Sequence, residues 1–336
     1  MSIANHALAH KNILITGATG FIGSRLAARL AAEEGAAVTG SGRHLARVAH
    51  LETHGVRLVR ADLLDEAATA ATLAGQEIVF HLAAWLRAHG DEAQAYAFNV
   101  TATERLLRQA AAAGVRRFIF TSSVNAYGPS DRAVLDETAP LDTELRDVYG
   151  RTKAIADLRV RELGAELGIE VVVIRPGMVY GPGAISWTVD MVKILRRGLP
   201  VIFGDGRGHA MPVYIDNLVD GLILAAVSPN APGEAFNLCD PVVDWHTFFG
   251  YYAAMCGHPP RAIPMWAARI LAWASEHFRF LGLPLTRERL AFYVMAADYP
   301  STKAENLLGY RQRIPIAEGM RHAETWLRQT GHLHNR

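Results

Sequence analysis

Three glycines in one short loop constrain the fold of this chain more than any other feature. Gly17, Gly20 and Gly23 directly follow an apolar run at 12–16 (NILIT), and a helical pattern comes next at 24–34 (SRLAARLAAEE). A strand, a glycine-rich turn and a helix in this order present free backbone N–H groups and the positive end of a helix dipole to one point, which suits a phosphate. We therefore predict a dinucleotide-binding loop. Its remaining contacts are predicted to be Thr19, Phe21 and Ile22.

Short apolar runs continue to alternate with helical patterns through the first half of the chain. Further strands are expected at 37–39, 57–60, 77–82, 117–122 and 170–175, and further helices at 45–53, 92–113 and 148–167. Continuous apolar strands separated by helices indicate a parallel sheet that is covered on both faces. Right-handed crossovers wind such a sheet in two directions, so we expect the doubly wound α/β architecture of the Rossmann fold over residues 1–183.

The second half of the chain has a different pattern. Prolines and glycines cluster there, and short strands and helices are interleaved with loops. The length of 336 residues also exceeds that of an average domain, which is about 150 residues. We expect a smaller, mixed α/β substrate domain at 184–336, from which a segment near 209–228 returns to the main sheet.

The end of the second strand predicts which dinucleotide binds. NAD-binding proteins usually place a carboxylate there for the ribose hydroxyls, whereas NADP-binding proteins place an arginine nearby for the 2′-phosphate. The segment 39–43 (TGSGR) has no carboxylate, and it offers the hydroxyl of Ser41 and the guanidinium of Arg43. NADP is therefore favoured, and NAD stays open. Asp62 and Leu63, after the third strand, are expected beside the adenine.

A tyrosine and a lysine four residues apart predict a catalytic pair. Tyr149 and Lys153 share one face of the helix expected at 148–167. The free pKa of tyrosine is about 10, and a nearby ammonium lowers it so that the phenol can exchange a proton with a substrate oxygen. Lys153 is also expected to contact the nicotinamide ribose. Ser123 follows the strand at 117–122, at the sheet edge where ligands bind, and is expected to orient the substrate oxygen.

Together these motifs resemble the extended short-chain dehydrogenase/reductase family, also called the NAD(P)-dependent epimerase/dehydratase superfamily. The resemblance covers nearly the whole chain and rests on the segments 17–23 (GATGFIG), 62–63 (DL), 81–84 (HLAA), 99–103 (NVTAT), 121–128 (TSSVNAYG), 149–153 (YGRTK), 175–183 (RPGMVYGPG) and 213–221 (VYIDNLVDG). It implies that Ser123, Tyr149 and Lys153 form a catalytic triad. It also implies cofactor contacts at Leu82, Ala83, Ala84, Asn99, Pro176, Gly177 and Val179.

Two methionines indicate the branch of that family. Sugar-nucleotide branches generally carry asparagine at the position of Met178 and arginine shortly before the segment 213–221, where this chain has Met211 nearby. Both polar residues hold phosphates in those branches, whereas methionine is flexible and suits an apolar substrate. The chain is more similar to the branch of 3β-hydroxysteroid dehydrogenase-like proteins and 2-alkyl-3-ketoacyl reductases. Substrate contacts are expected at Trp85, Asn125, Met178 and Met211.

These features predict an NAD(P)-dependent oxidoreductase that transfers hydride between the nicotinamide and a bulky, mostly apolar hydroxy or keto compound. A sugar-nucleotide epimerase or dehydratase, which keeps its cofactor and cycles it internally, is the alternative. A third hypothesis is a regulator that senses NADP without chemistry, although such a sensor has no need of the three catalytic side chains.

Composition argues against several other classes of protein. Lys plus Arg (34) nearly balances Asp plus Glu (33), so the chain has no general attraction for nucleic acid. Two cysteines, Cys239 and Cys256, make neither a disulfide framework nor a zinc pattern, and no metal site is expected. No signal-peptide core and no uncharged apolar run of about 20 residues is present. We expect a cytoplasmic protein without stable membrane insertion.

Two expectations concern surfaces. The segment 265–283 is expected to form an amphipathic helix beside the substrate entrance or, alternatively, to touch a membrane surface transiently. The family resemblance implies a homodimer through the helices at 92–113 and 148–167.

Overall fold

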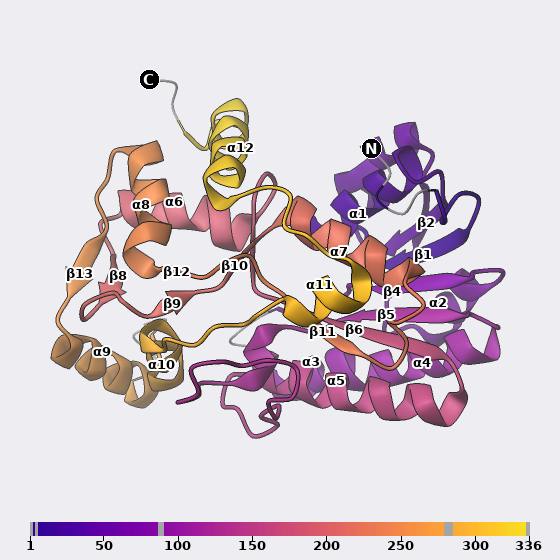
Figure 1. Cartoon of the computed structure of the whole chain (residues 1–336), viewed down its shortest axis with the longest axis horizontal. Helices are drawn as coiled ribbons and strands as arrows, with labels where there is room; N and C mark the ends of the chain where they lie inside the picture. Colours follow the sequence, from indigo (N-terminus) through magenta and orange to yellow (C-terminus); the bar gives the residue numbers. More distant parts are fainter. Residues whose placement is uncertain (1–2, 4–5, 87–90, 279–284, 334–336) are drawn as a thin grey trace.

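A seven-stranded parallel sheet organises the structure, a computed structural model that describes residues 3, 6–86, 91–278 and 285–333 (Figure 1). In spatial order the strands are β11 (Ala235–Leu238), β6 (Glu170–Pro176), β5 (Arg117–Thr121), β4 (Ile78–His81), β1 (Asn12–Thr16), β2 (Ala37–Gly42) and β3 (Arg57–Arg60). Chain order reverses between β1 and β4, which is the point where open α/β sheets bind ligands. The predicted doubly wound sheet is confirmed.

The sheet is buried on both faces, as its apolar strands predict. Along β1, Ile13 and Ile15 belong to one core cluster, whereas Leu14 between them belongs to the other. The same alternation separates Phe80 from Val79 on β4. Because successive strand side chains point to opposite faces, a continuous apolar run requires helices on both sides.

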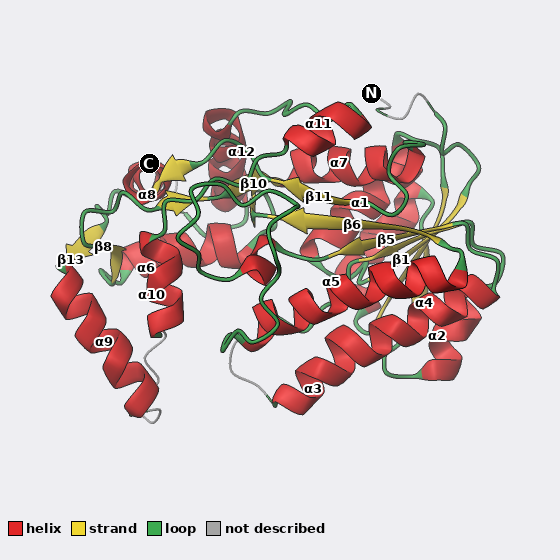
Figure 2. Ribbon diagram, turned by 60° about the horizontal axis from the view of Figure 1, so that its bottom comes forward, coloured by secondary structure: helices red, strands yellow, loops and turns green. Residues whose placement is uncertain are grey.

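Helices supply those two layers (Figure 2). One face carries α1 (Phe21–Ala32), α7 (Ile215–Val227) and α11 (Thr302–Leu308), and the other carries α2 (Glu66–Leu73), α4 (Ala102–Ala112) and α5 (Val148–Leu167). The range of α5 agrees with the predicted helix at 148–167. It begins after Asp147, whose carboxylate accepts a hydrogen bond from Gly150 N at 2.8 Å, and ends at Gly168 in the left-handed region.

Three helical segments differ from the sequence prediction. The long helix expected at 92–113 is interrupted: α3 (Glu92–Tyr96) and α4 are joined by a π-helical turn at Ala97–Thr101. The segment Leu45–His54 is a 3₁₀ helix. Helix α2 was not predicted, because its eight residues are short for a periodic pattern, although Asp65 caps it by accepting from Ala68 N at 2.9 Å.

The rest of the chain forms a smaller body at the other end of the molecule (Figure 1). Its strands pair in twos: β7 (Met178–Tyr180) with β10 (Pro212–Tyr214), β9 (His209–Ala210) with β12 (Val243–Asp244), and β8 (Pro200–Phe203) with β13 (Arg261–Ile263). Its helices are α6 (Asp190–Arg196), α8 (Trp245–Cys256), α9 (Met265–His277), α10 (Arg287–Val294) and α12 (Ile316–Gln329), and a short helical turn lies at Ile185–Val189. Another short helical turn, Val124–Tyr127, follows β5 of the main sheet and contacts α5.

The segment 209–228 returns to the main sheet through a helix. It adds no strand there, because only three residues of β10 are extended before α7 begins, and β10 pairs with β7. Helix α7 instead covers one face of the sheet. The strand that joins the sheet is β11, whose four residues are all buried and pair in parallel with Val173–Pro176 of β6.

Candidate functional site

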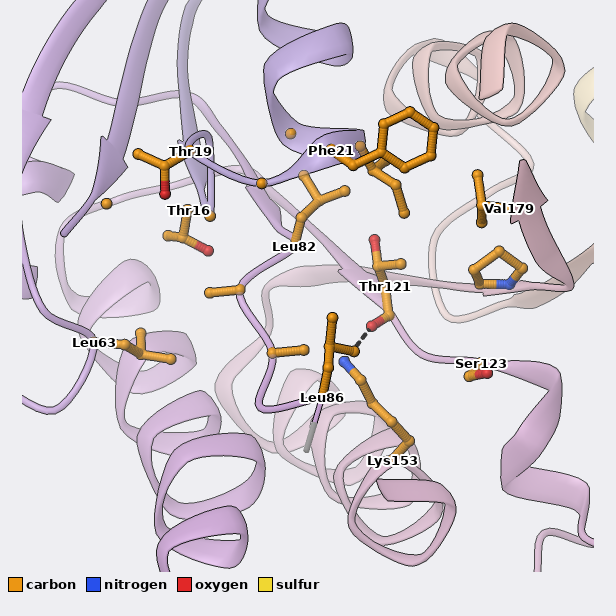
Figure 3. Close-up of a pocket in the computed structure, with 18 of the residues that line it drawn as sticks. Thr16, Thr19, Phe21, Leu63, Leu82, Leu86, Thr121, Ser123, Lys153 and Val179 are labelled. Carbon is orange, nitrogen blue, oxygen red and sulfur yellow. Dashed lines mark hydrogen bonds between the residues drawn. The ribbon is translucent and has the colours of Figure 1, made fainter. Parts of the chain in front are cut away.

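A cavity of about 520 Å³ lies at the carboxyl ends of the parallel strands (Figure 3). Its wall takes residues from the ends of five strands, among them Thr16, Ser41, Leu82, Thr121 and Pro176. We call the part lined by Arg43, Leu63, Thr69, Thr72 and Phe98 the β2 end. The part lined by Ser123, Asn125, Tyr149, Lys153 and residues 176–179 and 184–187 is the β6 end.

The glycine loop brings the main chain to the floor of this cavity. Gly17 has a φ of +76°, and a Cβ there would lie 2.7 Å from Ala83 N. A Cβ at Gly23 would lie 2.3 Å from Gly17 O. No side-chain hydrogen bond caps the start of α1 after Gly20, and the first residues of α1, 21–23, line the cavity. Any larger residue would close this cradle, and its open donors fit a pyrophosphate.

Among the described residues that line the β2 end, one side chain is cationic and none is a carboxylate. Arg43 lies with its Cζ 5.9 Å from the ring centre of Phe98 and its Nη1 3.9 Å from the Asp62 carboxylate. Asp62, predicted to contact the cofactor, lies outside the wall, because its other oxygen accepts a hydrogen bond from Leu64 N at 3.1 Å. Phe98 reaches the wall from the π-helical turn.

The structure places Ser123, Tyr149 and Lys153 together at the β6 end. Lys153 is buried, and its Nζ donates to the carbonyl oxygen of Thr121 at 2.7 Å and lies 4.7 Å from the ring centre of Phe120 (Figure 3). Burial lowers the pKa of Lys153 to about 7, which the nearby carboxylate of Asp157 partly offsets. The amine therefore changes charge near neutral pH.

The pKa of the Tyr149 phenol is raised, whereas that of Lys153 is lowered. Burial raises the pKa of Tyr149 to about 12, and the negative charge of Asp147 adds to this, while a hydrogen bond with Ser123 lowers it. Tyr149 is therefore protonated at neutral pH in the free protein and can donate a proton. Ser123 itself is held in place, because its Oγ accepts a hydrogen bond from Asn125 N at 3.1 Å.

A buried polar network connects α5 to the sheet. Arg175 at the end of β6 donates to both carboxylate oxygens of Asp157, each at 2.8 Å, and to the Tyr127 hydroxyl at 2.8 Å. That hydroxyl donates in turn to Oδ1 of Asn237 on β11 at 2.8 Å. Because Asp157 lies one turn after Lys153 on α5, the network ties this helix to two strands of the sheet.

Three other predicted site residues lie behind the wall. Asn99 accepts a hydrogen bond from Trp85 N at 2.7 Å and donates to Thr152 Oγ1 at 2.9 Å, so it fastens the loop after β4 to α5. Trp85 packs against Phe98, with ring centres 6.4 Å apart. Met211 is buried, and its carbonyl accepts from Met178 N at 2.7 Å. None of the three residues lines the cavity itself, and Trp85 and Met211 contact residues that do.

The structure also brings in residues that the sequence did not single out. Thr121 and Ser122 are buried, and their hydroxyls have no hydrogen-bond partner among the described residues although both residues line the cavity. Figure 3 shows the Thr121 side chain directed away from Lys153, towards the side of Phe21 and Val179. Buried hydroxyls normally find a partner, so these two fit a polar ligand. Their position after a buried strand was the available signal.

The wall of the β6 end is mostly apolar. Met178, Ala184, Ile185 and Trp187 line it, and Asn125 and Ser186 add neutral polar groups. Among the described residues that line the whole cavity, only Arg43 and Lys153 carry a charged side chain. The described part of the chain also holds no cluster of three or more His, Cys, Asp or Glu side chains that could ligate a metal ion.

Known proteins resemble this chain over most of its length. Residues 13–239 match the NAD dependent epimerase/dehydratase family. The 3 beta-hydroxysteroid dehydrogenase/Delta 5-->4-isomerase of Mycobacterium tuberculosis is 30% identical over 322 residues, which cover 89% of this chain and 85% of that protein. The 2-alkyl-3-oxoalkanoate reductase of Stenotrophomonas maltophilia is 29% identical over 325 residues, which cover 92% and 97% of the two chains. The solved structure of MoeE5 in complex with UDP-glucose and NAD is 26% identical, covers 95% of this chain and 99% of its own, and has a TM-score of 0.76.

Proposed function

Because the chain belongs to the NAD dependent epimerase/dehydratase family, we propose that it is an NADP-dependent dehydrogenase or reductase for a bulky, mostly apolar hydroxy or keto compound. The observation that carries this proposal is the wall of the β6 end. Met178, Ile185 and Trp187 offer apolar surface beside the Ser-Tyr-Lys group, and among the described residues of that wall none carries a guanidinium or an imidazole for a second diphosphate.

The three polar side chains have distinct roles in this proposal. A bound dinucleotide supplies the hydride donor or acceptor. Ser123 hydrogen-bonds the substrate oxygen and orients it. Tyr149 gives its proton to that oxygen when a ketone is reduced and takes it back when an alcohol is oxidised. The ammonium form of Lys153 stabilises the phenolate, because an opposite charge lowers the pKa of the phenol.

Selectivity for NADP rests on Arg43. Its guanidinium lines the β2 end, where the wall has no carboxylate to bind a free ribose diol. An arginine in this place pairs with a 2′-phosphate and has no equivalent partner on NAD. The carboxylate of Asp62 lies 3.9 Å from the Arg43 guanidinium and reduces the preference for NADP over NAD. Use of NAD at lower affinity is therefore part of the proposal.

The names of two relatives support the same substrate class. A hydroxysteroid dehydrogenase and an oxoalkanoate reductase both act, by their names, on hydroxy or keto carbon compounds. We extend only this common chemistry to the present chain.

A sugar-nucleotide epimerase or dehydratase is the second candidate. The similarity to MoeE5, whose structure holds UDP-glucose and NAD, favours it. A nucleotide sugar brings a diphosphate of its own, which needs positive charge, and among the described residues that line the β6 end only Lys153 can supply it. The apolar wall therefore ranks this candidate second.

The first experiment is calorimetric titration of the purified protein with NADPH, NADP, NADH and NAD, after any carried-over nucleotide has been measured. Exchangeable binding with a clear preference for NADP(H), followed by turnover of apolar ketones or alcohols, supports the proposal. NAD that co-purifies and resists dialysis, together with turnover of a UDP- or GDP-sugar, would overturn it in favour of the second candidate.

A further inference from the structure

Helix α9 (Met265–His277) turns three of its large apolar side chains away from the protein. Trp266, Ile270 and Trp273 are 67%, 57% and 43% exposed. Their spacing of four and three residues places them on one face of the helix. No other helix in the described part of the chain exposes three large apolar side chains. Figure 2 shows α9 at the edge of the molecule, far from the sheet. We call this face the tryptophan stripe.

The inner face of α9 carries small side chains instead. Ala268, Ala272 and Ser275 are buried, and the two alanines pack in a small cluster with Phe203 and Leu290. A surface helix normally buries its large apolar residues and exposes polar ones. In α9 the small residues are buried and the three residues of the tryptophan stripe are exposed. Such exposed aromatic surface indicates a site of contact with a partner outside the protein.

Charge on the tryptophan stripe is positive. Arg269 is exposed between the two tryptophans, and Arg261 is exposed on β13, shortly before the helix begins. The helix contains one carboxylate, Glu276, whose side chain accepts a hydrogen bond from Arg287 N at 2.9 Å and is mostly buried. The exposed face of α9 therefore combines indole rings with the guanidinium of Arg269 and presents no carboxylate.

We propose that the tryptophan stripe binds the surface of an anionic lipid bilayer. Indole rings favour the membrane–water interface, where an apolar body and a polar N–H are both accommodated. A helix with apolar residues on one face and basic residues beside them lies in the interface plane and is attracted by anionic headgroups.

The length of α9 limits the depth of this contact. Its 13 residues extend about 20 Å, whereas the hydrocarbon core of a bilayer is about 30 Å thick. No helix of the described residues has the length and apolar character to cross a membrane. The contact is therefore peripheral and reversible.

A second copy of the chain fits the tryptophan stripe less well. In a symmetric dimer the same patch meets itself, and Arg269 lies near the middle of the patch. A twofold axis through this face would bring two guanidinium groups together in a desolvated contact, which is unfavourable. Anionic headgroups offer the opposite charge at the same place.

Hydrogen bonds connect α9, which carries the tryptophan stripe, through α10 to the start of α5. Glu276 of α9 binds the start of α10, and Glu288 of α10 accepts hydrogen bonds from Asp147 N, at 3.2 and 3.1 Å, at the start of α5. A bilayer bound to α9 therefore lies at the end of the molecule that holds the β6 end. The proposal does not rest on the proposed function, since lipid binding is measured without turnover.

The test is co-sedimentation of the full chain with phosphatidylcholine vesicles that do or do not contain about half phosphatidylglycerol. We expect binding to the anionic vesicles at about 0.05 M salt and much weaker binding at about 0.5 M salt. The double variant Trp266→Ala/Trp273→Ala should lower the partition coefficient at least about tenfold, equivalent to about 1.4 kcal/mol. Arg269→Glu should lower it only for the anionic vesicles.

A matched control replaces two exposed leucines of another helix. Leu158→Ala/Leu167→Ala on α5 removes partly exposed apolar surface far from α9 and should bind vesicles as the unchanged chain does. Thermal unfolding of each variant shows whether it is folded. Absence of vesicle binding by the unchanged chain, or equal binding by the tryptophan variant, overturns the proposal. So does a dimer that the tryptophan variant abolishes while no vesicle is bound, because a second copy would then be the partner.

Discussion

Among the described residues, each end of the cavity has one cationic side chain, and these two cations differ in their surroundings. Arg43 at the β2 end has 51% of its side chain exposed and lies 3.9 Å from a carboxylate. Lys153 at the β6 end is 3% exposed and lies against a carbonyl oxygen and an aromatic ring. An exposed guanidinium lowers the stability of the fold very little, and it can select a ligand. A buried amine costs stability, so its retention indicates chemistry.

The largest expected effect tests the catalytic end. Tyr149→Phe removes the hydroxyl that exchanges the proton and leaves the ring in place, so kcat should fall by about 10²- to 10⁴-fold. Dinucleotide affinity should stay within about twofold, because the β2 end is unchanged. Steady-state kinetics with a ketone found by screening, together with calorimetry, measures both. Full turnover by this variant would show that another group moves the proton.

The next effect concerns the stability cost of Lys153. Its pKa is lowered by burial from 10.5 to about 7. Between these pH values the unfolded chain binds a proton that the folded chain does not, so the free energy of unfolding rises with pH across this window. Below pH 7 the full cost is present, and it is at most about 5 kcal/mol.

Lys153→Met removes this titration and should raise the unfolding temperature of the free protein while abolishing turnover. The gain should be larger at pH 6 than at pH 10, where the lysine in the unchanged chain is neutral in the folded state. Thermal unfolding at both pH values measures the difference. A gain that does not depend on pH would mean that Lys153 keeps its proton in the folded protein.

A smaller effect tests the β2 end. Arg43→Ala should raise the Kd for NADPH by about tenfold or more, the loss expected for a charged hydrogen bond, and should change the Kd for NADH by less than about twofold. Arg60→Ala is the matched control, because Arg60 is exposed at the end of the neighbouring strand and lies outside the cavity wall. Equal losses for both nucleotides would remove Arg43 as the selectivity residue.

The smallest expected effect tests the link between the C-terminal body and the catalytic helix. Glu288→Ala removes the acceptor of Asp147 N and should lower the free energy of unfolding by about 1 kcal/mol. It should also lower kcat about threefold by loosening the start of α5. Glu288→Gln keeps one acceptor oxygen, so its free energy of unfolding and its kcat should lie between those of the unchanged chain and those of Glu288→Ala. Chemical denaturation and steady-state kinetics measure these effects, and unchanged values would make the contact incidental.

Local sequence patterns predicted much of the β6 end. A spacing of four residues is enough to place Tyr149 and Lys153 on one helical face. The apolar run at 117–122 predicted a strand, and Ser123 directly follows that run. Patterns could not show that Asn99 and Trp85 bind each other behind the wall, since a π-helical turn lies in a segment with the appearance of one regular helix. For the same reason Phe98 was missed.

The sequence by itself determined the doubly wound sheet, the glycine loop and the presence of a serine, a tyrosine and a lysine near one strand end. These features depend on periodicity and on contacts between residues close in the chain. Only the tertiary structure decided that β11 joins the sheet while α7 covers one of its faces, that Thr121 and Ser122 leave unpaired hydroxyls in the cavity, and that Lys153 has a pKa near neutrality. Strand pairing, hydrogen-bond satisfaction and desolvation depend on which distant segments meet, and no local pattern encodes that.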